Sequence, residues 1–132
     1  MPEFSDRSLR RLSTVHPDLQ ILFQEVVKHF DCTVVSGLRT LEEQQALYAK
    51  GRPEGNIVTY ADGVERRSNH QSGNAVDVVP YPSGYSDAKK IRDFGWYVLG
   101  VAQMLKSYGA IDNDIKWGGK WKRFKDYPHF EI

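Results

Sequence analysis

The sequence has one cysteine, no long hydrophobic run and no large excess of charge of either sign. Cys32 has no second cysteine to pair with, which excludes the class of small domains held together by intramolecular disulfides. No segment approaches the roughly 18 consecutive apolar residues of a transmembrane helix. Eighteen basic against 17 acidic side chains leave a net charge of +1. We therefore expect no nucleic-acid partner and no stable membrane association.

The composition is that of a globular protein. Hydrophobic residues make up 40% of the chain and charged residues 27%, a balance that excludes intrinsic disorder. A length of 132 residues predicts one domain, and we expect a monomer. The first residues, MPEFSDRSLRRLS, contain no apolar stretch typical of a signal peptide. The protein is therefore expected in the cytoplasm of the cell that makes it, and action elsewhere requires release by another agent.

Helical periodicity and capping signals predict four helices. Pro17 suits the first turn of the second helix, and Thr40 with Glu43 forms a capping box before the third. The first helix is capped by Ser5, and the fourth by Ser86 or Asp87. The four segments cover residues 5–12, 17–30, 41–50 and 86–108.

Short β-branched segments between these helices predict a small sheet. Residues 32–36 and 75–79 are typical of strands, and residues 115–118 and 130–132 are expected to be extended. Residues 51–67 form a long loop, a length often associated with function. Because helices and strands do not alternate regularly, the fold class is α+β, with a small, mostly antiparallel sheet flanked by helices.

Two of the four histidines lie beside predicted strands and near carboxylates. His70 lies in SNHQSGNAVD and His129 in DYPHFE, whereas His16 and His29 are interpreted as surface or packing residues. Asp77 interrupts the apolar strand AVDVV, and a carboxylate in such a strand needs a partner. A catalytic zinc takes three nitrogen or oxygen ligands from the protein. The residues alone leave two interpretations open: a metal site, or a polar turn with a solvated Asp77.

These residues resemble the signature of a known family. The pattern S-x-H-x-x-G-x-A-x-D at residues 68–77, followed by D-x-x-H at 126–129, is similar to that of zinc peptidases that cut peptidoglycan stem peptides. This VanY-like M15 family includes D-alanyl-D-alanine carboxypeptidases and dipeptidases, and phage endolysins that are L-alanyl-D-glutamate peptidases. The resemblance covers nearly the whole chain. It implies a hedgehog/DD-peptidase-like fold and a single zinc peptidase catalytic domain over residues 1–132.

The resemblance also implies which residues hold the metal. His70, Asp77 and His129 match the zinc ligands of the family, and Asp126 matches its acid/base residue. Asp126 comes three positions before a ligand, so a turn can direct its carboxylate at the reacting water. From there a carboxylate accepts a proton during attack on the amide and returns it to the leaving amine.

Three further residues are candidates for supporting roles. The segment SGLRT at 36–40 looks like the arginine segment of the family, so Arg39 matches the residue that engages a substrate carbonyl or carboxylate. A guanidinium suits both tasks, and the alternative is a surface arginine before a helix cap. Glu131 and Ser68 are candidates for holding the histidines in the required tautomer.

The segment KWGGKWKRFK at 116–125 combines five basic and three aromatic residues without an acid. Three interpretations stay open: a single-stranded nucleic-acid site, a rim facing the cell wall or membrane, and a solvated face. Trp117 also suits the core beside the zinc site. Trp96, on the long predicted helix, is expected to pack.

The resemblance implies a phage-type endolysin that hydrolyses the peptidoglycan stem peptide, with the L-alanyl-D-glutamate bond as the expected target. Aspartate at position 126 favours this class, because the D-alanyl-D-alanine enzymes more often have glutamate there. The alternatives are a D-alanyl-D-alanine carboxypeptidase or dipeptidase, and a wall-binding relative without activity. The implied partner is a bacterial peptidoglycan peptide. The implied location is the host cytoplasm until release through the inner membrane by a holin-type protein.

Overall fold

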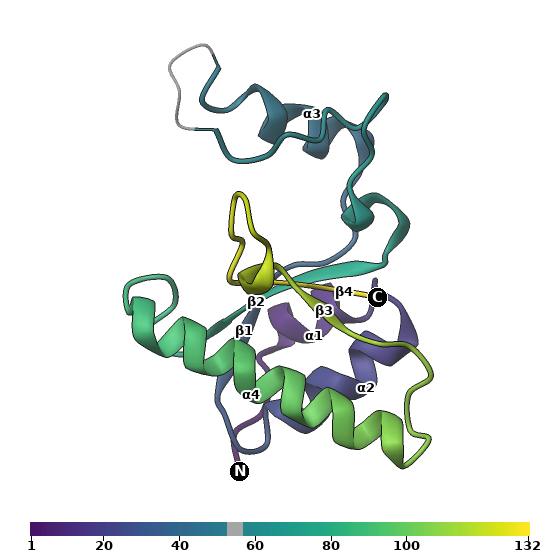
Figure 1. Ribbon diagram of the computed structural model, residues 1–132, viewed down its shortest axis with the longest axis vertical. Helices are drawn as coiled ribbons and strands as arrows, with labels where there is room; N and C mark the ends of the chain where they lie inside the picture. Colours follow the sequence, from purple (N-terminus) through teal and green to yellow (C-terminus); the bar gives the residue numbers. More distant parts are fainter. Residues whose placement is uncertain (53–56) are drawn as a thin grey trace.

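A four-stranded antiparallel sheet lies at the centre of the computed structural model, which describes residues 1–52 and 57–132 (Figure 1). The strand order is β1-β2-β4-β3, and all three pairings are antiparallel. The strands are β1 (Cys32–Ser36), β2 (Ala75–Pro80), β3 (Lys116–Trp117) and β4 (His129–Glu131). This arrangement confirms the α+β class with a small antiparallel sheet.

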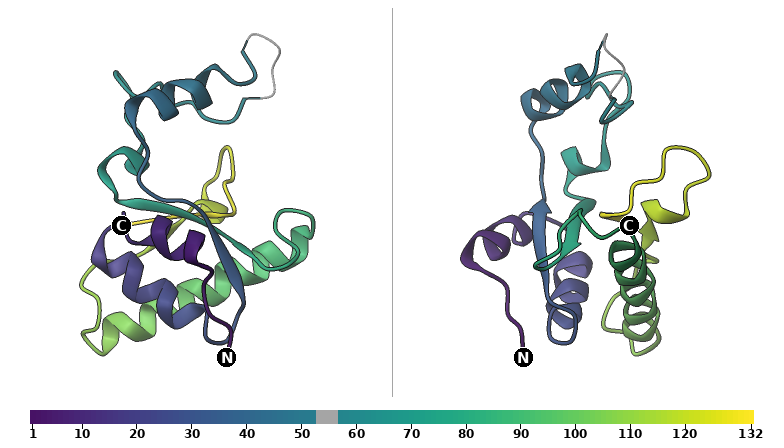
Figure 2. Two further views of the ribbon diagram at one scale, coloured as in Figure 1. Left: turned by 180° about the vertical axis from the view of Figure 1, so that it is seen from behind. Right: turned by 90° about the vertical axis from the view of Figure 1, so that its left-hand side faces the viewer.

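The described residues form four helices, of which the first, second and fourth surround the sheet. The third lies apart from them at the top of Figure 1. The helices are α1 (Asp6–Leu12), α2 (Pro17–Val26), α3 (Leu41–Ala49) and α4 (Ala88–Ser107). α1 and α4 lie on opposite sides of β1 in the right-hand view of Figure 2. Among the described residues, no helix combines the length and hydrophobicity needed to cross a bilayer.

Aromatic rings from two helices and one strand meet in the core. Phe23, Phe94 and Phe130 are fully buried, and the ring of Phe130 lies 5.3 Å from that of Phe23 and 6.2 Å from that of Phe94. The helix predicted for residues 17–30 ends earlier, at Val26. Phe30 therefore reaches the core from a turn, where its ring packs 5.0 Å from Phe94.

The structure confirms most of the helix starts that the capping signals predict. The capping box of Thr40 and Glu43 is present, and Asp87 rather than Ser86 caps α4. His16, interpreted as a surface or packing residue, caps α2 by accepting a hydrogen bond from the backbone N–H of Asp18. These helix starts are thus specified by hydrogen bonds between residues close in sequence, without a tertiary contact.

Other local predictions are corrected. The segment 115–118 is a strand only at its middle, because a short 3₁₀ helix, η2 (Gly118–Lys120), begins at Gly118. By contrast, the loop predicted for 51–67 is confirmed where it is described: residues 53–56 lie outside the described residues, and the others contain no helix or strand. Trp96 is 58% exposed, although its ring meets that of Trp117 at 5.2 Å.

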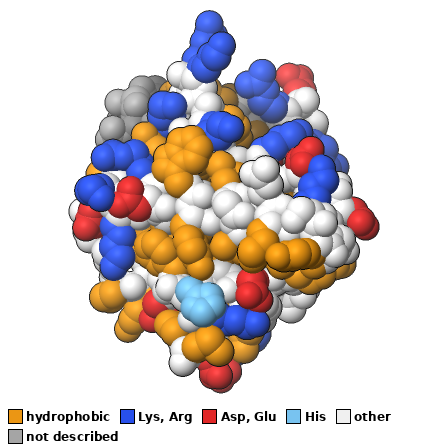
Figure 3. All heavy atoms as spheres, turned by 60° about the horizontal axis from the view of Figure 1, so that its bottom comes forward, with side chains coloured by type: hydrophobic (Ala, Val, Ile, Leu, Met, Phe, Trp, Pro, Cys, Tyr) orange, Lys and Arg blue, Asp and Glu red, His pale blue; other side chains and the backbone are white. Residues whose placement is uncertain are grey.

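Hydrophobic side chains also gather across the middle of the face shown in Figure 3.

Candidate active site

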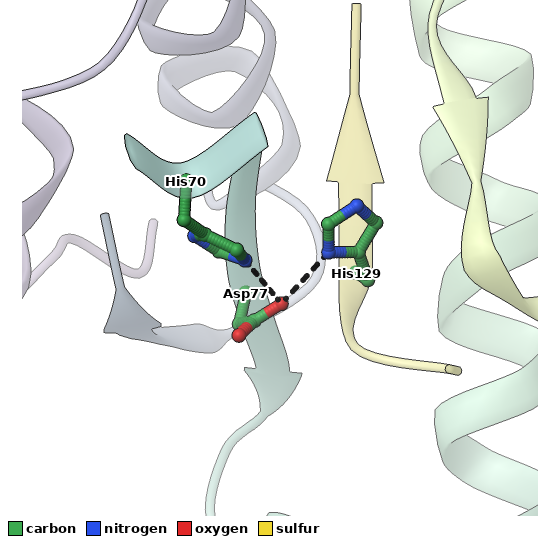
Figure 4. A group of neighbouring side chains, drawn as sticks. All are labelled: His70, Asp77 and His129. Carbon is green, nitrogen blue, oxygen red and sulfur yellow. Dashed lines mark ion pairs between the residues drawn. The ribbon is translucent and has the colours of Figure 1, made fainter. Parts of the chain in front are cut away.

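Three side chains predicted to hold a metal meet where β2 and β4 pair. Asp77 on β2 is directly opposite His129 on β4, and His70 comes from the short 3₁₀ helix η1 (Asn69–Ser72) that precedes β2. Asp77 Oδ1 lies 3.3 Å from His70 Nε2 and 3.4 Å from His129 Nδ1 (Figure 4). One ligand atom from each residue lies within 4.8 Å of the other two. Strand pairing and one helical turn therefore assemble the cluster.

The surroundings of the Asp77 carboxylate show whether a metal ion fits this cluster. Asp77 Oδ1 is buried and has no hydrogen-bond partner among the described residues. Such an orphaned oxygen is costly unless a ligand satisfies it. Burial raises the pKa of Asp77, but His129 and His70 outweigh it and hold the pKa well below its usual range. An ionised oxygen facing two imidazole nitrogens is a donor set that suits a divalent cation, zinc included.

Hydrogen bonds orient His70 toward Asp77. Its Nδ1 donates to the carbonyl of Gly37 at 2.9 Å, which leaves the lone pair of Nε2 directed at the cluster. Gly73 ends η1 with a φ of +77°, a conformation that favours glycine. The Ser68 hydroxyl accepts from the backbone N–H of His70 at 3.2 Å. Ser68 thus caps the 3₁₀ helix, and the imidazole tautomer that it was expected to set is set by the backbone of Gly37.

His129 is held by a carboxylate on its far side. Its Nε2 lies 2.6 Å from Glu131 Oε1, and the other Glu131 oxygen accepts from Asn69 Nδ2 at 2.9 Å. Burial lowers the pKa of His129, but the nearby Asp77 carboxylate and the hydrogen bond with Glu131 outweigh it and raise the pKa to about 9. Because Nε2 is engaged by Glu131, Nδ1 is the nitrogen that faces Asp77. The contact expected between Glu131 and a histidine is present.

Asp126 lies at the edge of the cluster. Its Oδ2 is 3.9 Å from His129 Nδ1, and its side chain is 33% exposed. Burial and the neighbouring Asp77 raise the pKa of Asp126. Its backbone N–H donates to the carbonyl of Gly118 at 3.0 Å, and a Cβ at Gly118 would come within 2.2 Å of the Asp126 carbonyl oxygen. A glycine at 118 is therefore what lets the chain hold this carboxylate beside the cluster.

Arg39 faces the cluster from the end of β1 and is not a surface residue. Its side chain is only 11% exposed, and Nη2 lies 3.6 Å from Asp77 Oδ2. Nη2 also donates to Ser36 Oγ at 3.3 Å, and Nη1 donates to Gln44 Oε1 at 2.8 Å. Sequence reasoning missed Gln44. The available signal was that the predicted helix 41–50 has no continuous apolar face, so its contact with the rest of the chain had to be polar.

The cluster opens into a cleft of about 1090 Å³. α3 and the segments 58–61 and 66–69 line one side, and the segment 121–129 lines another. The exposed rings of Tyr60 and Phe124 meet edge to face at 5.3 Å, and Trp121 lies 5.1 Å from His129. The basic and aromatic segment 116–125 therefore contributes to two different regions of the protein. Trp117 is buried, whereas Trp121 and residues 123–125 line the cleft.

Comparison with known proteins defines the class of this chain. A family model described as D-alanyl-D-alanine carboxypeptidase matches residues 62–132, a segment that contains the whole cluster. The chain belongs to this peptidase family. An alignment with the peptidoglycan L-alanyl-D-glutamate endopeptidase CwlK of Bacillus subtilis is 39% identical over 113 residues and covers 80% of this chain. The chain spans only 62% of the length of CwlK.

Two further relatives match almost the whole chain. The L-alanyl-D-glutamate peptidase of Escherichia phage T5 is 28% identical over 132 residues, covering 98% of this chain and 88% of that protein. The crystal structure of the Serratia marcescens L-Ala D-Glu endopeptidase ChiX superimposes with a TM-score of 0.69 at 28% identity, over 98% of this chain and 90% of ChiX. The D,D-pentapeptidase VanY, solved with Zn(II), shares the fold with a TM-score of 0.55 at 19% identity, over 92% of this chain and 70% of VanY.

Proposed function

We propose that this chain is a zinc-dependent peptidase that hydrolyses the L-alanyl-D-glutamate bond of the peptidoglycan stem peptide. The observation that carries the proposal is the buried, unsatisfied Asp77 Oδ1 facing two oriented histidine nitrogens at the base of a cleft. The names of CwlK, the phage T5 enzyme and ChiX support the choice of bond. In this proposal residues 1–132 act as one catalytic domain.

The proposed zinc ligands are His70 Nε2, Asp77 Oδ1 and His129 Nδ1. Zinc held there would supply Lewis-acid polarisation of the scissile carbonyl and a lowered pKa for water. Gly37 and Glu131 contribute by fixing which imidazole nitrogen faces the site. Their hydrogen bonds orient both rings before any ligand arrives.

Asp126 and Arg39 are proposed to perform the remaining chemistry. Asp126 accepts a proton from the attacking water and delivers it to the leaving amine. Arg39 directs a fixed positive charge at the developing negative charge of the substrate carbonyl, or holds a substrate carboxylate.

The cleft rim suits a peptide that carries carboxylates. Five basic residues line it in addition to Arg39, namely Lys50, Arg66, Arg67, Arg123 and Lys125. Away from the cluster, Glu43 is the one acidic residue among the described lining residues, and it is engaged in the α3 capping box. The proposed partner is a peptidoglycan peptide, whose carboxylates these basic residues would attract. The protein is proposed to act as a monomer, without nucleic acid or stable membrane association.

The direct test is digestion of purified peptidoglycan followed by mass spectrometry of the products. Cleavage at the proposed bond releases the peptide from muramyl-L-alanine, whereas the family description favours the alternative, loss of a terminal D-alanine. A chelator should abolish the reaction and added zinc restore it. Loss of D-alanine alone would replace the proposed bond, and full activity in chelator would contradict the metal assignment.

Three substitutions separate metal binding from proton transfer. His70→Ala and Asp77→Asn should lose stoichiometric zinc. Asp126→Asn should keep zinc and the fold, while turnover falls about 10²- to 10⁴-fold, the usual contribution of a general base. Asp93→Asn on the exposed face of α4 is the matched control and should leave turnover unchanged. Loss of zinc in Asp126→Asn would make Asp126 a ligand instead.

The proposed site of action is the peptidoglycan outside the inner membrane, reached from the host cytoplasm through a holin-type release. The phage T5 relative supports this setting. Expression of the chain alone in a Gram-negative host should leave cells intact, and permeabilising the inner membrane should then cause lysis. Rapid lysis on expression alone would contradict the need for a release partner.

A further inference from the structure

α3 buries an amide in place of an apolar face. All nine residues of α3 are described, and Gln44 is the buried one, with 0% of its surface exposed. Helices at the surface of globular proteins ordinarily attach through a stripe of apolar side chains. A buried amide is tolerated only when its donors and its acceptor are satisfied. The bonds made by Gln44 are therefore the buried part of the attachment of this helix.

The two ends of the Gln44 amide bind two different parts of the cleft. Its Oε1 accepts from Arg39 Nη1 at 2.8 Å. Its Nε2 donates to the carbonyl of Ala61 at 2.7 Å and lies 3.5 Å from Thr59 Oγ1. The orientation of the amide is fixed, because a flipped side chain would place its NH₂ group against a guanidinium, which only donates.

Arg39 depends on this amide more than on its other neighbours. The bond from Nη1 to Gln44 is 2.8 Å long, whereas the bond from Nη2 to Ser36 Oγ is 3.3 Å and the separation from Asp77 Oδ2 is 3.6 Å. A short hydrogen bond restrains the guanidinium plane more than two longer contacts do. Gln44 thus determines how the guanidinium faces Asp77 and the cleft.

We propose that Gln44 is a positioning residue for the peptidase reaction. It holds the Arg39 guanidinium in a fixed orientation toward the cleft and, through Ala61, ties that orientation to the 59–61 wall. The effect on rate rests on the proposed function, whereas the restraint on Arg39 does not. Misorientation of a charge-stabilising group lowers the rate because that stabilisation requires a preorganised donor.

The kinetic test compares two variants and a control. Gln44→Leu removes both bonds and should lower kcat roughly tenfold or more, with KM changed less than about threefold. Gln44→Glu keeps an acceptor for Arg39 and loses the donor to Ala61, so its kcat should stay closer to wild type. Gln20→Leu is the matched control. Gln20 lies on α2, its Nε2 donates to the Val15 carbonyl at 2.8 Å, and it does not line the cleft.

A double-mutant cycle separates positioning from a structural role. If Gln44 acts through Arg39, Gln44→Leu should cause no further loss of kcat in an Arg39→Ala background. Independent losses that multiply, or Gln44→Glu as impaired as Gln44→Leu, would overturn the proposal. The zinc content of each variant should match that of wild type, and the α3 amides should stay as protected from hydrogen exchange as in wild type, since a purely structural role would open this helix.

Nuclear magnetic resonance of the guanidinium gives a readout that does not need activity. In the wild-type protein the Nη–H signals of Arg39 should be separate and slow to exchange, because Nη1 is engaged by Gln44. Gln44→Leu should average them, and Gln44→Glu should preserve them. Unchanged Arg39 signals in Gln44→Leu would overturn the proposal. A wild-type protein that releases no peptide from peptidoglycan would overturn the proposed function and leave this measurement valid.

Discussion

Two regions of the molecule are stabilised in different ways. The body, defined as α1, α2, α4, η1 and the sheet, is held by a buried apolar core. The arm, residues 38–52 and 57–67, contains one buried side chain among its described residues, that of Gln44. In Figure 1 the arm lies above the body and α3 is separate from the other helices. The body thus supplies stability and the metal-binding cluster, and the arm supplies Arg39 and a cleft wall.

Local polar contacts organise the arm. The guanidinium of Arg52 stacks 3.7 Å above the ring of Tyr48 and donates to the carbonyls of Tyr48 and Thr59, the latter at 3.1 Å. Each such bond contributes about 1 kcal/mol net, because water competes for the same groups. Burial of a large apolar side chain contributes roughly 1.5–3 kcal/mol. The arm should therefore open at a lower free energy than the body.

The largest difference between body and arm is expected in the loss of free energy of unfolding when an apolar side chain is truncated. Phe94→Ala in the body should lower the free energy of unfolding by about 3–5 kcal/mol, because it leaves a cavity between Phe30 and Phe130. Leu47→Ala in the arm should cost less than about 1 kcal/mol, since Leu47 is only partly buried. Urea unfolding followed by circular dichroism measures both. Equal losses would show that the arm shares the core.

Hydrogen exchange should reveal the same contrast in the unmodified protein. Backbone amides in the middle of α3 should exchange at least about 10²-fold faster than those in the middle of α4, because α3 opens without exposing a core. Exchange followed by mass spectrometry or NMR measures the difference. Equal protection of the two helices would contradict the division into body and arm.

A buried carboxylate makes the body sensitive to acid. Burial raises the pKa of Asp18, but hydrogen bonds from the backbone and side chain of Asn113 and the backbone of Asp112 outweigh it and lower the pKa. A lowered folded-state pKa stabilises the protein above the unfolded-state pKa of about 3.9, and this stabilisation is lost as pH falls through the folded-state value.

Asp18→Asn should therefore lower the free energy of unfolding by about 1.5–3 kcal/mol at pH 7, the range for hydrogen bonds to a charged group. The gap in free energy of unfolding between wild type and variant should narrow as pH falls below about 4. Urea titrations at several pH values measure it, and effects common to both proteins cancel in the difference. A gap that stays constant down to pH 2.5 would contradict the assignment to Asp18.

The smallest effects concern two helix caps of similar chemistry. Thr40 Oγ1 accepts from Glu43 N at 3.1 Å in α3, and Asp87 Oδ1 accepts from Lys90 N at 3.0 Å in α4. Loss of either cap costs its helix about 1 kcal/mol. Asp87→Ala should lower the global free energy of unfolding by that amount. Thr40→Ala should accelerate exchange within α3 and leave the global value nearly unchanged. A global loss in both would show that α3 unfolds with the body.

Much of the fold was predictable because its signals are local. Thr40 with Glu43 marked the start of α3, and Pro17 marked that of α2. The α+β class was correct because the strands are short and do not alternate regularly with helices. The end of α2 was wrong, since the apolar pattern continued to Phe30 while the chain had already left the helix at Val26. A buried face indicates which residues face the core, but not whether they are helical.

The sequence by itself placed two of the possible ligands together, because the tight turn at Gly73 and the adjacent strand bring His70 and Asp77 into one local segment. Only the tertiary structure decided what surrounds them. The pairing of β2 with β4 placed His129 opposite Asp77, although the two are far apart in the chain. The carbonyl of Gly37 and the amide of Gln44 are ordinary groups that no pattern singles out. They orient His70 and Arg39 because the packed fold brings them within hydrogen-bonding distance of the side chains that they hold.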